Sequence, residues 1–165
     1  MRAHGTLVEA PDAAPRNIPG SPYTGIYTGA SVTDTAVFPP KVLGVYPVFV
    51  PRADSDGTAI AGIRMLPLAV PRATYTGWNP RAHGFSAGAL LSLQGAAVPF
   101  APTRAERDAS GNPRPSLAER YADNAAYVAT VAKAASEMVA ERLLLPQDAE
   151  RAIELAKQDT LSRLK

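Results

Sequence analysis

The most recognisable catalytic pattern in the sequence is a G-x-S-x-G pentapeptide at residues 84–88, in which Ser86 is the candidate nucleophile. In serine hydrolases this pattern forms an elbow: a buried strand runs into a strained turn that exposes the serine, and a helix follows. Here the preceding residues 77–83 are typical of a loop, and no histidine follows Ser86 in the chain. Since the acid and the histidine come after the serine in that fold, we interpret the match as accidental.

The remaining chemistry-bearing residues do not complete a catalytic set. His4 and His83 are the two histidines, far apart in the chain, and we interpret both as surface loop residues. The absence of cysteine excludes disulfides, thiol catalysis and Cys-ligated metals. No HExxH, P-loop, dinucleotide fingerprint or S-x-x-K pattern occurs. We therefore predict no catalytic residue, no metal site and no cofactor in this chain.

Two aspartates, Asp54 and Asp56, precede Gly57 at the spacing that opens a calcium loop. A full loop needs further ligands and a bidentate glutamate, and the next glutamate is Glu106. We therefore interpret the segment as a hairpin turn.

The residues most suited to binding lie in the segment 74–81, which holds the single tryptophan. Tyr75, Trp78 and Asn79 offer contact area and fixed hydrogen-bonding groups, which makes them candidates for the rim of a substrate pocket. The same residues can anchor a loop, if Trp78 is buried and Asn79 is hydrogen-bonded. Both interpretations stay open at this point.

The secondary structure expected around these residues changes along the chain. All 12 glycines and 15 of the 16 prolines, which disfavour long helices, lie in residues 1–115. Residues 1–44 have no sustained apolar period and are predicted to be an extended Pro/Gly-rich strap. Residues 45–115 are predicted to be an irregular β-rich and loop region. Within it, strands are expected at 45–50 and 59–65, followed by a third extended piece at 68–76.

The last fifty residues are predicted to form a two-helix hairpin. Ser116 and Glu119 have the spacing of a capping box, which places a helix start at this point. An apolar stripe then continues to about residue 144. The stripe consists of Leu117, Tyr121, Val128, Val131, Ala135, Met138 and Val139. Pro146 suits the first turn of a second helix, whose predicted apolar positions are Ile153, Leu155, Ala156, Leu161 and Leu164.

Charge and hydropathy restrict the classes of partner. Seventeen basic and fifteen acidic residues give a net charge of +2 without a polybasic cluster, which argues against nucleic acid. No stretch approaches the roughly 18 apolar residues of a membrane-spanning helix, and residues 1–15 contain no apolar run typical of a signal segment, so we expect neither in this chain. The sequence does not determine the compartment.

Three segments carry a resemblance to a known family. They are Thr74–Asn79 (TYTGWN), Thr103–Arg107 (TRAER) and Pro113–Tyr121 (PRPSLAERY). Together with the order of the residues around them, they resemble the C-terminal region of larger bacterial proteins described as alpha/beta hydrolase domain-containing. The likeness extends over roughly residues 40–160. It implies a hydrolase whose nucleophile, oxyanion-hole donors, acid and histidine lie upstream of this region, so that none is carried onto this chain.

The sequence therefore predicts an α+β chain in one structural unit: the strap 1–44, the irregular region 45–115 and the helical hairpin 116–165. We expect an accessory C-terminal region of an alpha/beta-hydrolase-like protein, inactive alone, which packs on a catalytic domain in the same polypeptide or in a separate subunit. Tyr75, Trp78 and Asn79 are its substrate-rim candidates. The alternative is a stand-alone interaction module that binds a partner protein through the helical hairpin.

Overall fold

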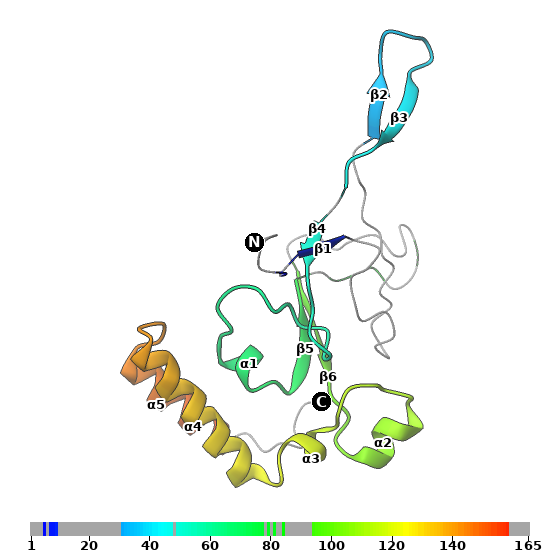
Figure 1. Ribbon diagram of the computed structural model, residues 1–165. Coiled ribbons are helices and arrows are strands. Elements are labelled where there is room, and N and C mark those ends of the chain that lie inside the picture. Colours follow the sequence, from blue (N-terminus) through cyan, green and yellow to red (C-terminus); the bar gives the residue numbers. More distant parts are fainter. Residues whose placement is uncertain are drawn as a thin grey trace.

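The structure is a computed structural model that describes residues 5, 7–9, 31–47, 49–77, 79, 81, 84 and 94–158 (Figure 1). It is α+β, as predicted, with three two-stranded antiparallel sheets and five helices in the described part. No described helix is long and apolar enough to cross a membrane. The elements are β1 (Leu7–Glu9), β2 (Ser31–Asp34), β3 (Lys41–Val45), β4 (Phe49–Pro51), α1 (Leu66–Ala69), β5 (Ala73–Thr76), β6 (Ala96–Pro99), α2 (Arg104–Ala109), α3 (Leu117–Arg120), α4 (Asn124–Ala140) and α5 (Pro146–Gln158).

Within residues 1–44, predicted to be an extended strap, the described residues include the extended strands β1 and β2 and most of β3. β1 pairs with β4, and β2 pairs with β3, each antiparallel. The β2–β3 ladder projects away from the other described elements (Figure 1). We call residues 31–46 the arm. Every residue of β3 is exposed on both faces, which explains why no one-sided apolar period marks the strand in the sequence.

The hairpin turn predicted at Asp54–Gly57 is present, but the strand predicted at 59–65 is wrong. Gly57 has a φ of 83° in the turn, and one isolated antiparallel bridge joins Ala53 to Ala59. The ladder ends there because Gly62 takes a φ of 86°, a conformation that turns the chain away from a strand.

The third extended piece predicted at 68–76 begins in the last two residues of α1 and ends in the strand β5. α1 forms a single turn with a proline near its start, and it contacts α4. β5 follows and pairs with β6 from Ala73 opposite Pro99 to Thr76 opposite Ala96. The two strands approach closely at Gly95, where an added Cβ would lie 2.2 Å from the Thr76 carbonyl oxygen. Only glycine fits this position without displacing β5 or β6.

α2 lies in the region predicted to be β-rich and loop. Its start is a capping box: Glu106 N–H donates to Thr103 Oγ1 at 3.3 Å, and Thr103 N–H donates to Glu106 Oε2 at 3.2 Å. This spacing is visible in the sequence and would have predicted the helix.

The helix predicted from residue 116 to about 144 divides into two. The start is correct: Glu119 Oε2 accepts hydrogen bonds from the Ser116 N–H at 2.8 Å and from the Ser116 hydroxyl at 2.7 Å. α3 nevertheless ends after one turn, with Tyr121 in an extended conformation. Asp123 then begins α4, because its Oδ1 accepts the Ala126 N–H at 2.8 Å. A second cap therefore interrupts the helix inside the apolar stripe.

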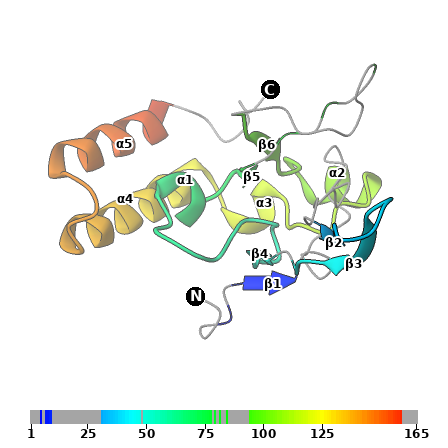
Figure 2. The same cartoon turned by 90° about the horizontal axis from the view of Figure 1, so that it is seen from above.

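α4 ends earlier than predicted, and α5 begins at Pro146 as predicted. Arg142 has a φ of 61°, Arg142 N–H donates to Val139 O at 3.0 Å, and Leu143 N–H donates to Met138 O at 2.8 Å. This is the Schellman arrangement that terminates a helix. α4 and α5 contact each other and lie side by side (Figure 2). Of the predicted apolar positions of α5, Ala156 is buried and Ile153 is partly buried, whereas Leu155 is 56% exposed, and residues 161 and 164 lie outside the described residues.

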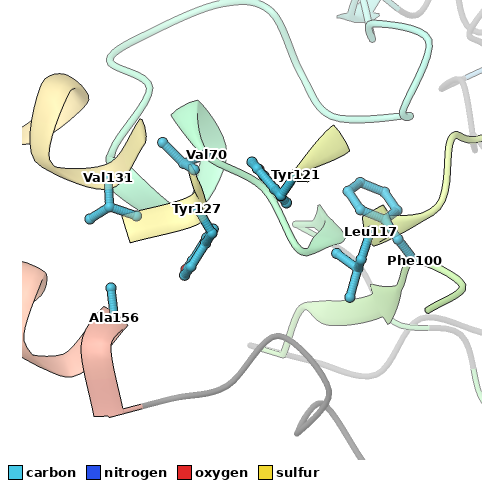
Figure 3. Packing of buried hydrophobic residues seen from close by; sticks show 7 residues of the cluster. All are labelled: Val70, Phe100, Leu117, Tyr121, Tyr127, Val131 and Ala156. Carbon is cyan, nitrogen blue, oxygen red and sulfur yellow. The ribbon is translucent and has the colours of Figure 1, made fainter. Parts of the chain in front are cut away.

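The core is small and elongated. Its members come from the segments around α1, β6, α3, α4 and α5, with Tyr121 between the two ends (Figure 3). The cluster consists of Val70, Phe100, Leu117, Tyr121, Tyr127, Val131 and Ala156. Tyr127 is absent from the stripe predicted for this helix, yet it is 8% exposed, whereas the predicted Val128 is only partly buried.

Candidate functional site

A groove of about 640 Å³ opens at the end of the core where α1, β5, α4 and α5 meet. Four core residues that gather at one end of Figure 3, Val70, Tyr127, Val131 and Ala156, form part of its wall. Its lining is mostly aliphatic with a few polar groups. The described residues that line it are Leu66, Pro67, Val70, Arg72, Tyr75, Tyr127, Val131, Ala152, Leu155, Ala156 and Gln158.

Tyr75 supplies a hydrogen-bonding group to the groove from β5. Its side chain is partly buried, and burial is the main cause that raises the pKa of its phenol above the ordinary value. Proximity to Tyr127 also raises this pKa, and Arg72 opposes the shift. The hydroxyl is therefore neutral at physiological pH and can donate a hydrogen bond. No hydrogen bond joins it to another described residue.

Tyr127 lies beside it, on α4. Its ring meets the Tyr121 ring edge to face, with centroids 5.1 Å apart and planes at 72°. The Arg72 guanidinium carbon lies 5.5 Å from the centroid of the Tyr127 ring. Tyr121 in turn donates its hydroxyl hydrogen to the Pro71 carbonyl oxygen at 2.9 Å, and burial raises its pKa to about 12. These contacts fix the chain just before β5 against α4.

The far side of β5 is held by Arg114, which is 1% exposed. Its Nη1 donates to Thr74 Oγ1 at 2.8 Å and to Val98 O at 2.9 Å, so one guanidinium joins β5 to β6. Nη2 donates to Pro99 O at 3.2 Å. Burial lowers the pKa of Arg114 from its ordinary value, but an arginine remains charged in proteins. Arg114 therefore positions the strand that carries Tyr75.

A second arginine ties the Asp54–Gly57 turn to α3. Arg120 forms a bidentate ion pair with the Asp56 carboxylate, in which Nη1 donates to Oδ2 at 2.8 Å and Nη2 donates to Oδ1. The Arg120 and Arg114 guanidinium carbons lie 4.0 and 5.1 Å from the centroid of the Phe100 ring. Thr74 Oγ1 also donates to the Asp56 carbonyl oxygen. The turn, β5 and α3 are thus held as one body.

The carboxylates of the same turn have partners that a calcium ion would have to displace. Asp54 Oδ1 accepts the N–H groups of Asp56 and Thr58, each at 3.0 Å, and Asp54 Oδ2 accepts from Arg64 at 2.9 Å. Among the described residues there is no group of three or more His, Cys, Asp or Glu side chains suited to a metal. The turn interpretation holds for this segment.

The structure places one of the three predicted rim residues in the groove. Tyr75 lines it, Asn79 is partly buried beyond the end of β5, and Trp78 lies outside the described residues. The other residues tested for catalysis, Ser86, His4 and His83, also lie outside them. Sequence analysis missed Arg72 and Tyr127 as groove residues. For Tyr127 a signal existed, because Tyr127, Val131, Ala135 and Met138 follow the period of one helix face, and all four are buried.

Comparison with known proteins supports the family resemblance of the sequence. The family model described as "Alpha/beta hydrolase domain" matches residues 6–154. No curated protein and no solved structure matches the chain.

Proposed function

The chain belongs to the family described as alpha/beta hydrolase domain, since that model matches most of its length, and from this premise we propose that it is the accessory region of an alpha/beta-hydrolase-like protein. In this proposal the protein hydrolyses an ester or a related bond. The nucleophile, the oxyanion-hole donors, the acid and the histidine belong to a catalytic domain, which is either part of the same polypeptide or a separate subunit. The present region contributes to substrate binding.

The observation that carries the proposal is the position of Tyr75. Tyr75, whose hydroxyl is neutral, lines a mostly apolar groove of about 640 Å³, a volume within the range of small-molecule sites. In the proposal, Tyr75 with Trp78 and Asn79 forms the rim of the substrate site, and this rim faces the catalytic domain.

The residues that carry the family resemblance support an accessory role. In the segment 113–121, Arg114 joins β5 to β6, Arg120 binds Asp56 and Tyr121 binds Pro71. Each of these side chains holds two segments of the chain together. Such residues position a binding surface and do not themselves attack a substrate.

The exposed apolar surface of the arm supports a catalytic domain as the partner. An isolated two-stranded ladder is marginally stable in water, and this one carries large apolar side chains in solvent. Phe38, at its tip, is 97% exposed. The other exposed apolar residues of the arm are Val37, Val42, Leu43, Val45 and Tyr46. In the proposal, the catalytic domain covers this surface.

Labelling with a fluorophosphonate probe tests the absence of a nucleophile in this region. We expect no covalent adduct on the purified chain, and no ester hydrolysis above that of a Ser86→Ala variant. A catalytic serine hydrolase of another family, treated in parallel, controls for probe activity. Stoichiometric labelling that disappears in Ser86→Ala would mean that the chain is itself the hydrolase, and the proposal would then be wrong.

A further inference from the structure

We propose that the groove between β5 and helices α1, α4 and α5 binds an acyl chain, with the chain against the aliphatic wall and its carbonyl oxygen accepting a hydrogen bond from Tyr75. This inference rests on the proposed function and deepens it. It assigns the apolar acyl part of the substrate, or of the acid released from it, to named residues of the present region.

The shape and lining of the groove favour an apolar ligand. The aliphatic wall comes from two sides: Leu66, Pro67 and Val70 from the α1 segment, and Val131 with Leu155 from α4 and α5. Burying apolar ligand surface against such a wall is favourable, because it removes that surface from water. Leu155 is 56% exposed although it lies on this wall, so the wall has apolar surface available for a ligand.

The polar groups of the groove favour an acceptor oxygen at one end of that ligand. Tyr75 and Tyr127 both line the groove, and no hydrogen bond joins either hydroxyl to another described residue. A ligand that fills the groove displaces water from these hydroxyls, and an acceptor oxygen in the ligand restores the lost hydrogen bond. The donors can serve the carbonyl of an ester as well as the carboxylate of its product.

The charges of the groove argue against a cationic ligand. Arg72 is the charged residue of the lining, and no carboxylate lies among the described lining residues. The guanidinium of Arg72 lies against the Tyr127 ring and remains charged. An acyl chain that ends in a carbonyl or carboxylate meets no like charge in the described lining, whereas a chain of the same length that ends in an ammonium group meets the like charge of Arg72 and no described carboxylate.

Calorimetric titration with three nine-carbon probes tests the inference. The probes are 2-nonanone, nonanoate and nonylammonium, which each have nine carbon atoms and an apolar chain and differ in their polar group. We expect the ketone or the carboxylate to bind, the ketone representing the ester and nonanoate the released acid. We expect the ammonium probe to bind at least tenfold more weakly, a factor that corresponds to about 1.4 kcal/mol. Equal binding of all three would contradict the role of the carbonyl oxygen.

Two variants locate the binding. Tyr75→Phe removes only the hydroxyl and should weaken the binding of the ketone or the acid about three- to tenfold, the effect of one hydrogen bond. Ala152→Phe fills the groove from α5 and should abolish the binding. Thr130→Val, which removes an exposed hydroxyl of α4 outside the groove, is the control and should bind like the wild type. Circular dichroism and thermal unfolding of each variant show that it is folded.

The results separate this inference from the proposed function. If no acyl probe binds, or if Tyr75→Phe and Ala152→Phe bind like the wild type, the acyl site is wrong. The accessory role then still stands on the labelling experiment. If Ser86 is labelled while the acyl probes bind as expected, the accessory role is wrong and the acyl site remains.

Discussion

Arg114 is the residue on which the arrangement of the β5–β6 sheet depends most. It is almost fully buried, and its side chain donates to Thr74 of β5, to Val98 and Pro99 of β6, and to Asn112 Oδ1 at 3.0 Å. A buried guanidinium is tolerated because its donors are satisfied by oxygens and its face lies on the Phe100 ring. The sequence marks Arg114 only as part of a family segment, since its partners lie up to 40 residues away.

Arg114→Met should destabilise the chain by about 3 kcal/mol, because several hydrogen bonds of roughly 1 kcal/mol each are lost and buried carbonyl oxygens are left without a donor. Urea denaturation followed by circular dichroism measures the effect. Arg104→Met, an exposed position on α2, is the matched control and should change stability by less than about 0.5 kcal/mol. Similar midpoints for the two variants would show that the buried network contributes little.

At the scale of elements, hydrogen bonds between neighbours in sequence decide where each element starts and stops. The Asp123 side chain starts α4 and thereby divides the predicted long helix. Thr103 and Glu106 start α2. Caps of this kind can be recognised in the sequence, and this includes the caps of α2 and α4, which the sequence analysis did not identify. The pairing of β5 with β6 is different, because a segment of about twenty residues separates the two strands and their close approach depends on a missing side chain at Gly95.

Gly95→Ala should destabilise the chain by about 1–3 kcal/mol, since the new Cβ would overlap the Thr76 carbonyl oxygen and force β5 and β6 apart. Gly77→Ala provides the matched control in the same region, because no atom lies within 4 Å of its added Cβ. Thermal unfolding of the two variants measures the difference. If both lose the same stability, the cost comes from the glycine backbone and the close approach at Gly95 is unimportant.

The whole molecule has a body and a projecting arm. The body holds the core, the groove and both arginine networks, whereas the arm leaves large apolar side chains in solvent. A surface of this kind is typical of an interaction site. At this scale the proposed function makes the arm the contact to the catalytic domain and the groove the contact to the substrate.

Phe38→Asp should leave the unfolding temperature of the isolated chain unchanged within about 2 °C, because a side chain that is 97% exposed contributes little to its own fold. In the same variant, binding to a separately supplied catalytic domain, followed by light scattering, should weaken at least tenfold. Thr35→Asp adds the same charge at a polar, exposed position of the arm and serves as the control. If the unfolding temperature drops strongly in the isolated Phe38→Asp variant but not in Thr35→Asp, the chain itself covers Phe38 and the prediction is wrong.

The sequence by itself determined the family and the α+β class. It also determined three local features: the turn at Asp54–Gly57, the helix cap at Ser116 and the first helical turn at Pro146. Each of these features depends on residues within four positions of one another, so it can be recognised from the order of the residues. The sequence also singled out Tyr75 as a candidate for a substrate rim, on the chemistry of its side chain, and the structure shows that Tyr75 lines a groove.

Only the tertiary structure decided what surrounds Tyr75 and what holds it there. Arg114 reaches Thr74 across 40 residues, and Arg120 reaches Asp56 across 64. Tyr127 comes to lie beside Tyr75 because Tyr121 anchors the chain at Pro71. Contacts of this range leave no periodic trace in the sequence, since the energy of each depends on the folded positions of both partners and on the exclusion of water between them.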